Sequence, residues 1–262
     1  MALDQKRMNE RVPESLRAAL IEGDYPRGKA RKLGIPDVIH GFRTERILTR
    51  TSVITTLGSC FAQELRIWLA KHGYNSPQTD VGIVYTPRNI RQIVQWSLEP
   101  QTWNPCQRYY VVNNRYFDPY RKSEVKYFPG QLFLGPVYLG DTKEAADAAL
   151  SEHYKRNGDL LRSVDVLVVT LGLTELWQHK TDKAALFAMP SAAEYDPNQH
   201  EFYNLSYPEV VEELDAIVAL LARNNPKAKI LLTVSPIPLS NTMRLELGPV
   251  IATAFSKSVL HA

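Results

Sequence analysis

The chain has 262 residues, of which 44% are hydrophobic and 23% are charged, and its formal net charge is +3. This composition is typical of a globular protein that can bury a substantial core, and it excludes a disordered chain. The small net charge and the lack of long basic runs argue against a nucleic-acid partner. No apolar stretch approaches the roughly 18 residues that span a bilayer, so no membrane partner is expected.

Two cysteines are too few for a disulfide framework, and the spacing of Cys and His does not suggest a zinc site. No Gly-x-Gly-x-x-Gly follows a predicted strand, which disfavours a Rossmann-type nucleotide binder. We therefore expect no metal and no cofactor. The first residues lack the apolar core of a signal peptide, and a reducing, cytoplasmic compartment is the expectation.

Residues 1 to about 50 are polar and basic, and three prolines interrupt any long element. We interpret residues 1–50 as a lead segment that packs on the domain formed by residues 51–262.

The turn at residues 58–60 is the feature around which the chain is organised. Residues 51–57 are rich in Val, Ile and Thr and predict a strand. Residues 60–72 predict a helix, because apolar side chains recur on one face. These are Phe61, Leu65, Trp68 and Leu69.

Ser59 and Cys60 therefore lie between the carboxyl end of a strand and the amino end of a helix. Ligands of open α/β sheets bind at such edges, and helix N–H groups there favour a negative charge. The alternative is a turn without chemistry, since Ser is a preferred N-cap and a buried Cys often acts as a small hydrophobic residue.

Further along the chain, residues 81–85 predict a second short strand, and residues 87–96 a helix that begins with proline. Residues 97–140 are rich in aromatic residues and lack helical periodicity. Tyr110 to Val112, followed by two asparagines, predicts one arm of a hairpin. Such an insertion can be a substrate platform, but a local aromatic core is the favoured interpretation.

A capping box at residues 141–144 opens a predicted helix that ends near Gly158. Residues 164–171 are almost continuously apolar and predict a central parallel strand. Residues 178–207 predict a second, irregular insertion, in which His200 would be a surface loop residue. Another capping box at residues 206–209 opens a helix.

The chain then continues with a predicted buried strand at residues 229–234 and a helix at residues 249–260. This alternation predicts an α/β fold, a three-layer α/β/α sandwich with a parallel sheet of the flavodoxin-like type. Residues 53–57, 166–171 and 230–234 are expected to be neighbouring parallel strands.

Residues 58–62, Gly-Ser-Cys-Phe-Ala, resemble the motif for which the GSCFA family is named. Three further segments are similar to hallmarks of that family in the same order. These are residues 170–177, 233–239 and 256–260. The family is grouped with the SGNH, or GDSL-like, hydrolases, so the resemblance implies an SGNH-hydrolase-like fold.

In SGNH hydrolases a serine after the first strand attacks an ester, and backbone and side-chain donors form the oxyanion hole. The resemblance places Cys60 in the nucleophile register, with Ser59 as the second candidate. Gly58, Gly172 and Glu175 match other motif positions, and Thr174 stands where an oxyanion-binding Asn is found in those hydrolases. A thiolate at a helix amino end needs less help from a base, which favours Cys60.

By the resemblance, an Asp-x-x-His block beyond residues 256–260 supplies the base in SGNH hydrolases, and no such block follows those residues here. His200, in an insertion at the same sheet edge, is the candidate that remains, and His179 is a weaker one. Thr86 and Ser235 follow other predicted strands and are candidate substrate-binding residues.

The resemblance implies an acyl-ester hydrolase or acyltransferase, with acylated glycans as one candidate substrate class. The missing block favours an alternative, a catalytically inactive module that binds its ligand in the same crevice. Residues 58–61, 172–175 and 235–238 each follow a strand and are expected to line one crevice.

Overall fold

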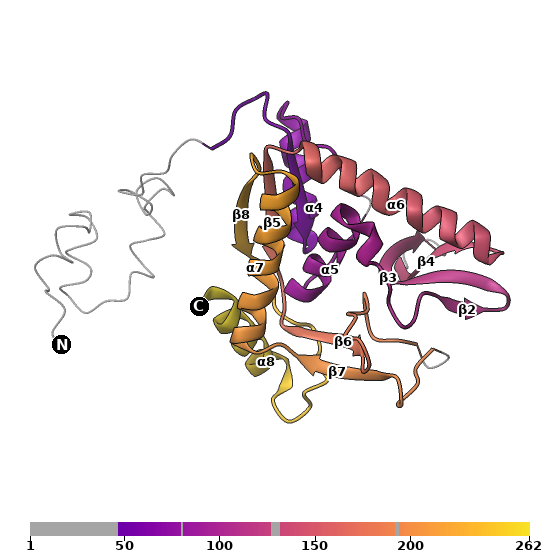
Figure 1. The fold of residues 1–262 in the computed structure, drawn as a ribbon. Coiled ribbons are helices and arrows are strands. Elements are labelled where there is room, and N and C mark those ends of the chain that lie inside the picture. The colour runs from indigo at the N-terminus through magenta and orange to yellow at the C-terminus, as the bar shows by residue number, and fades with distance from the viewer. Residues whose placement is uncertain (1–46, 80, 127–131, 192–193) are drawn as a thin grey trace, which may run out of the picture. The chain divides into compact units, whose positions relative to one another are not determined.

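A three-stranded parallel sheet lies at the centre of the fold (Figure 1). It consists of β1 (Ile54–Gly58), β5 (Val166–Leu171) and β8 (Lys229–Val234), in the order β1-β5-β8. The register pairs Ile54 with Val166, and Val166 in turn with Lys229. The predicted α/β class and the three neighbouring parallel strands are therefore confirmed.

This computed structural model describes residues 47–79, 81–126, 132–191 and 194–262. The predicted lead segment up to residue 46 lies outside the described residues. Residues 48–262 form one compact unit.

Helices cover both faces of the sheet. They are α4 (Cys60–Lys71), α5 (Pro87–Leu98), α6 (Lys143–Ser163), α7 (Tyr207–Asn224) and α8 (Gly248–His261). Side chains alternate along β5, as strand geometry requires. Val166 and Val168 pack with Leu69 of α4, whereas Leu167 and Val169 join a cluster with residues of α5 and α7.

The apolar face of α4 differs from the prediction. Ala62 and Leu69 are buried, but Phe61 and Trp68 are exposed. Trp68 instead stacks on His72, with the ring centroids 4.0 Å apart. The sheet covers only a narrow strip of this helix, so side chains at the margin of the apolar stripe stay in solvent.

Strand β8 was predicted to be buried, and this is wrong. It is an edge strand, and Leu231 and Leu232 are 37% and 46% exposed. Its apolar sequence resembles that of a central strand, because sequence alone does not show how many faces of a strand neighbouring elements cover.

The predicted strand at residues 81–85 is also wrong, since these residues form no ladder. Val84 donates a single backbone hydrogen bond to Gly58, and Tyr85 accepts two from the turn after β5. Gly82 has a φ of 75°, which interrupts extended geometry. The segment instead links the carboxyl ends of β1 and β5.

The aromatic insertion contains a short 3₁₀ turn, η2 (Pro100–Thr102), and an antiparallel sheet beside α6 (Figure 1). Its strands are β2 (Tyr110–Val112), β3 (Arg115–Lys126) and β4 (Leu132–Gly140). Asn113 and Asn114 form the predicted turn with φ values of 50° and 59°. Tyr120, Trp96 and Tyr154 are buried in one cluster, so the local aromatic core is confirmed.

The second insertion is more regular than predicted. Strand β6 (Glu175–His179) pairs with β7 (His200–Asn204) in an antiparallel hairpin. His200 is only 2% exposed, so its prediction as a surface loop residue is wrong.

Helix α6 continues past its predicted end at Gly158. A Cβ atom at Gly158 would lie 2.1 Å from the Ser97 carbonyl oxygen of α5. The glycine thus permits close helix packing rather than ending the helix. The amino end of α6 is capped by Thr142. The predicted capping box of α7 is present at Ser206 and Glu209.

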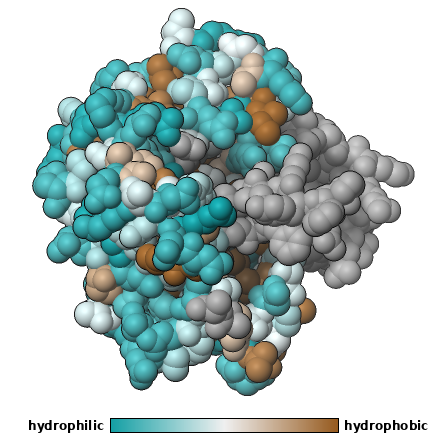
Figure 2. All heavy atoms as spheres, turned by 90° about the vertical axis from the view of Figure 1, so that its right-hand side faces the viewer, coloured by the Kyte–Doolittle hydropathy of each residue, from teal (hydrophilic) through white to brown (hydrophobic). Residues whose placement is uncertain are grey.

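Figure 2 shows the side of the molecule that carries α6 and the antiparallel sheet of β2, β3 and β4. Hydrophilic residues form most of the visible surface, and the hydrophobic ones are scattered among them. Across the described part of the chain, no helix is both long and apolar enough to span a bilayer.

Candidate active site

The turn between β1 and α4 requires a glycine. Gly58 has a φ of 131°, and a Cβ atom there would lie 2.1 Å from the Thr170 carbonyl oxygen of β5. The Ser59 N–H donates to that same carbonyl over 3.2 Å. Residues 58–59 are therefore held against β5, and the first residue of α4 is fixed in place.

Ser59 and Cys60 face different environments. Ser59 is 1% exposed, and its hydroxyl has no hydrogen-bond partner among the described residues. The Cys60 thiol is free, the residue is half-buried, and it lines a cavity. Of the two candidate nucleophiles, Cys60 is therefore the one that a bound molecule can reach.

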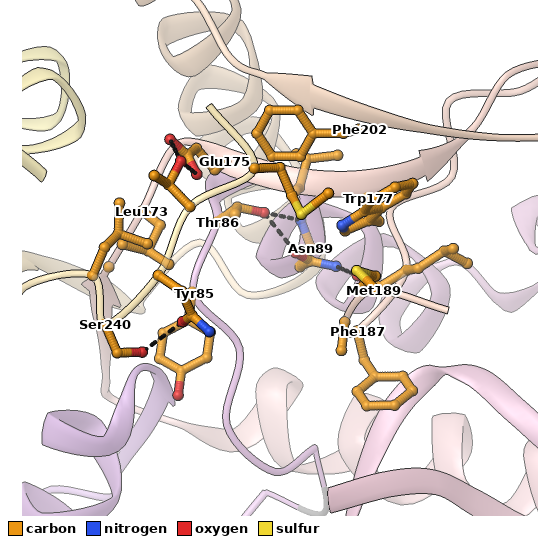
Figure 3. Close-up of a pocket in the computed structure, with 18 of the residues that line it drawn as sticks. Tyr85, Thr86, Asn89, Leu173, Glu175, Trp177, Phe187, Met189, Phe202 and Ser240 are labelled. Atoms are coloured by element: carbon orange, nitrogen blue, oxygen red, sulfur yellow. Dashed lines mark hydrogen bonds between the residues drawn. The ribbon is translucent and has the colours of Figure 1, made fainter. Parts of the chain in front are cut away.

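The cavity has a volume of about 540 Å³ and lies at the carboxyl edge of the sheet (Figure 3). All three predicted segments contribute to it, with Cys60, Gly172 and Ser235 among the lining residues. In Figure 3, Trp177 and Met189 lie on one side of the cavity, and Tyr85 lies on the other. Its walls are largely apolar, and its size is typical of a small-molecule site.

Tyr85 lies close to Cys60, and the sequence did not indicate it as a site residue. A Cβ atom on Gly172 would lie 3.0 Å from the Tyr85 ring, so the glycine makes room for this side chain. Burial raises the pKa of Tyr85 above its ordinary value, and the charge of Cys60 raises it further. The phenol therefore stays protonated near neutral pH and can donate a hydrogen bond.

The first turn of α4 offers further donors. The Ala62 N–H donates to the Ser59 carbonyl, but among the described residues the N–H groups of Cys60 and Phe61 donate to no protein acceptor. Unpaired N–H groups at a helix amino end favour a negative charge. Cys60 thus lies where both a thiolate and an oxyanion would be stabilised.

Thr174 does not line the cavity. Its hydroxyl donates to the Asn204 side chain over 2.7 Å and lies 2.8 Å from the Ser256 hydroxyl of α8. Lys257 donates to the Gly172 carbonyl in the same region. Residues 256–257, from the fourth hallmark segment, therefore brace the turn between β5 and β6.

The other predicted binding residues are held by local contacts. The Thr86 hydroxyl donates to the Asn89 side-chain oxygen over 2.6 Å, and both residues line the cavity. Glu175 also lines it and accepts hydrogen bonds from the Thr242 hydroxyl at both carboxylate oxygens. Glu175 is the acidic residue in the cavity lining. Its carboxylate can therefore accept a hydrogen bond from water or from a polar part of a ligand.

His200 lies outside this cavity. Its Nδ1 accepts from the Asp196 N–H, and its Nε2 donates to the Gln107 side chain over 2.9 Å. Both ring nitrogens are thus engaged. No histidine of the described chain lines the cavity.

The apolar wall is formed by residues that the sequence analysis did not connect with the site. They include Leu176, Trp177, Leu186, Met189, Phe202 and Met243. Their sequence pattern does not differ from that of ordinary core residues. Leu186, Met189 and Phe202 lie in the predicted second insertion, Leu176 and Trp177 end the hallmark segment 170–177, and Met243 lies between β8 and α8.

The fold and this site define an α/β protein with a thiol at a strand-to-helix turn, facing an apolar cavity. A family model for the GSCFA family matches residues 53–262, so the chain belongs to the GSCFA family. Comparison with curated proteins and with solved structures gave no match.

Proposed function

We propose that this protein is an acyl-ester hydrolase or acyltransferase in which Cys60 is the nucleophile. The observation that carries the proposal is the position of the Cys60 side chain. It lies at the first turn of α4 and on the wall of a largely apolar cavity. The unpaired N–H groups at a helix amino end favour a negative charge, which is the charge of the attacking sulfur.

In the proposed reaction, the Cys60 sulfur attacks the carbonyl carbon of an ester, and the carbonyl electrons move to the oxygen. The N–H groups of Cys60 and Phe61 stabilise this oxyanion, and the Tyr85 hydroxyl is the third donor. The C–O bond then breaks, and the leaving alkoxide takes a proton from solvent. Water or an acceptor alcohol next attacks the thioester and releases the thiol, with loss of a proton.

The apolar side of the cavity suits the acyl part of the ester. Trp177, Met189 and Phe202 provide surface for an alkyl chain, and about 540 Å³ is more than an acetyl group needs. The alcohol part would lie toward the polar residues Glu175 and Thr242. A glycan is one candidate for that alcohol. The proposal involves no membrane partner and no nucleic-acid partner.

Two free cysteines suit a reducing compartment, which would keep Cys60 in the thiol form. We therefore propose a cytoplasmic location.

The experiment measures cleavage of p-nitrophenyl esters whose acyl chains range from acetyl to decanoyl. We expect activity to rise with chain length before it falls. Cys60→Ala should abolish activity, by a factor of about 10³ or more. Tyr85→Phe should lower it by about a hundredfold, the lower end of the range for loss of one oxyanion donor.

Ser59→Ala is the matched control, because it removes the neighbouring hydroxyl from the same turn. It should retain most of the activity. Mass spectrometry of the wild-type protein should detect an acyl group on the peptide that contains Cys60. Loss of activity in Ser59→Ala together with full activity in Cys60→Ala would transfer the role to Ser59.

A second candidate is a binding module without catalysis, and the lack of a histidine in the cavity favours it. This candidate predicts that a folded wild-type protein binds a fatty acid but does not cleave any ester of the series. Iodoacetamide separates the two further. A catalytic Cys60 should be alkylated faster than Cys106 near neutral pH, because burial and Asp182 raise the pKa of Cys106 to about 11.

A further inference from the structure

Three donor atoms of metal-ligand type meet outside the cavity. They are the Cys106 sulfur, His179 Nδ1 and a carboxylate oxygen of Asp182, and all lie within 4.8 Å of one another. The sulfur is 3.0 Å from His179 Nδ1. Cys106 is 73 residues from His179, so no sequence motif could have linked them.

The segment from β6 to Ala184 holds two of these residues in fixed positions. The His179 N–H donates to the Ala184 carbonyl, and the Ala184 N–H donates to Asp182 Oδ1. Lys183 closes the turn with a φ of 58° and donates back to the His179 carbonyl. Asp182 is thus oriented by its own loop.

Cys106 is attached to the same loop from the other side. Its backbone N–H donates to Asp182 Oδ2 over 2.7 Å, which brings the thiol beside the carboxylate. Cys106 and Asp182 are exposed, whereas His179 is 4% exposed. His179 Nε2 is buried and has no partner among the described residues, so Nδ1 is the nitrogen that faces the two exposed donors.

This arrangement does not suit a nucleophilic triad. In such a triad the carboxylate lies behind the imidazole and orients it. Here Asp182 accepts a hydrogen bond from Cys106 and, among the described residues, none from His179. Burial raises the pKa of the Cys106 thiol, and the Asp182 carboxylate raises it further. A free thiolate is therefore disfavoured.

We propose that Cys106, His179 and Asp182 bind a divalent transition metal ion of the zinc type, with the fourth position open to water. Thiolate, imidazole and carboxylate are the ligands that zinc prefers, and three protein ligands plus water complete a tetrahedral ion. The Cys106 thiol loses its proton to solvent when it binds. The metal would fasten the segment before β2 to the loop after β6.

The geometry requires little movement. Zinc lies about 2.3 Å from sulfur and about 2.0–2.1 Å from a ligating nitrogen, so two such ligands at tetrahedral angles are about 3.5 Å apart. The observed sulfur-to-nitrogen distance is 3.0 Å. A shift of about half an ångström by the exposed Cys106 side chain would bring the sulfur and the nitrogen to this spacing. The carboxylate oxygen, which lies within 4.8 Å of both atoms, would move toward the ion.

The site is independent of the proposed reaction, although its loop lies near the cavity. Trp177 and Leu186, which flank residues 178–185, both line the cavity. Metal binding would therefore also stiffen one cavity wall. The test uses metal binding and not activity, so the two proposals can fail separately.

The experiment titrates the chelator-treated protein with Co²⁺ and records the absorption spectrum. We expect one equivalent to bind with a thiolate-to-cobalt charge-transfer band and tetrahedral ligand-field bands, and Zn²⁺ to displace it. Cys106→Ser should abolish the charge-transfer band, and Asp182→Asn should weaken binding by about tenfold or more. Zn²⁺ should raise the unfolding temperature of the wild type but not that of Cys106→Ser.

Two variants serve as controls. Cys60→Ser removes the other thiol, and Asp196→Asn changes a half-buried loop carboxylate that also accepts a backbone hydrogen bond. Both should bind Co²⁺ as the wild type does. The proposal is overturned if the wild type binds no equivalent of Co²⁺ with a thiolate band. It is also overturned if the band survives Cys106→Ser or disappears in Cys60→Ser.

Discussion

At the level of single residues, the turn between β1 and α4 directs its two nucleophilic side chains to different places. Ser59 is in extended geometry at the end of the strand, with a φ of −67° and a ψ of 176°, and it is buried. Cys60 is the first helical residue and lines the cavity. A difference of one residue in register therefore decides which side chain lines the cavity.

His200 shows how burial changes the role of a residue. It packs edge-on against the rings of His179 and Tyr110, with the His179 centroid 5.2 Å away. Its hydrogen bonds from Asp196 and to Gln107 fit a neutral imidazole. Burial lowers the pKa of His200, and the neighbouring His179 lowers it further. His200 is thus a structural residue of the hairpin.

This lowered pKa predicts a pH dependence of stability. The unfolded chain binds a proton at His200 near pH 6.5, whereas the folded protein binds it only at lower pH. The unfolded state therefore holds more protons in that window, and the free energy of unfolding should fall as the pH drops from about 6.5 to the folded pKa. Urea unfolding between pH 5 and pH 8 measures this.

His200→Gln is the variant for comparison, because an amide can still bond to Gln107. Its free energy of unfolding should fall less steeply than that of the wild type below about pH 6.5. Above pH 7.5 the two curves should run parallel. An unchanged slope in the variant would show that His200 does not titrate differently on folding.

At the level of elements, the packing of α5 against α6 depends on Gly158. Glycine lowers helix stability by about 1 kcal/mol relative to alanine, yet it lies inside α6. The near contact with the Ser97 carbonyl explains its presence, since any Cβ atom would push the two helices apart. The carbonyl belongs to the backbone and cannot turn away as a side chain would.

Gly158→Ala is therefore predicted to destabilise the protein, although helix propensity alone predicts the opposite. We expect a loss of about 1–3 kcal/mol, as is common for overpacked sites, measured by chemical unfolding. Ser151→Ala, on the exposed side of the same helix, is the control. It should be neutral or stabilising by a few tenths of a kcal/mol. A stabilised Gly158→Ala would mean that the helices separate at no cost.

The two insertions differ in what they contribute. The sheet of β2, β3 and β4 packs on α6 through its own aromatic cluster. The hairpin of β6 and β7 contributes Trp177 and Phe202 to the cavity wall. Loops at the carboxyl edge of a parallel sheet often carry function, because the rigid sheet positions them.

At the level of the whole molecule, the central sheet is covered unequally. Strand β5 lies between two neighbours and is buried along its whole length, whereas β8 is at the edge. Leu167 of β5 is fully buried and Leu232 of β8 is 46% exposed. The same residue type should therefore contribute very differently to stability in the two strands.

We predict that Leu167→Ala lowers the free energy of unfolding by about 2–5 kcal/mol, because it leaves a cavity in a packed core. Leu232→Ala should cost less than about 1 kcal/mol, as expected for a side chain that already contacts solvent. Urea unfolding of the two variants under one condition tests this. Equal losses would contradict the exposed position of β8.

Much of the fold could be predicted from the sequence, because its determinants are local. Runs of β-branched residues define β1 and β5, and capping residues define the start of α7. The order of strands and helices then leaves few topologies open. The same local signals placed Cys60 and Gly172 at one sheet edge, where both line the cavity.

Other features depend on contacts between residues far apart in the chain, and local patterns do not encode these. The burial of His200 depends on Gln107, 93 residues away, and Thr174 bonds to Ser256 rather than facing a ligand. The same holds for the position of Tyr85 against Gly172. The sequence thus determined which residues end the strands, and the tertiary structure decided which of them reach the cavity, because side-chain direction depends on the elements packed around each turn.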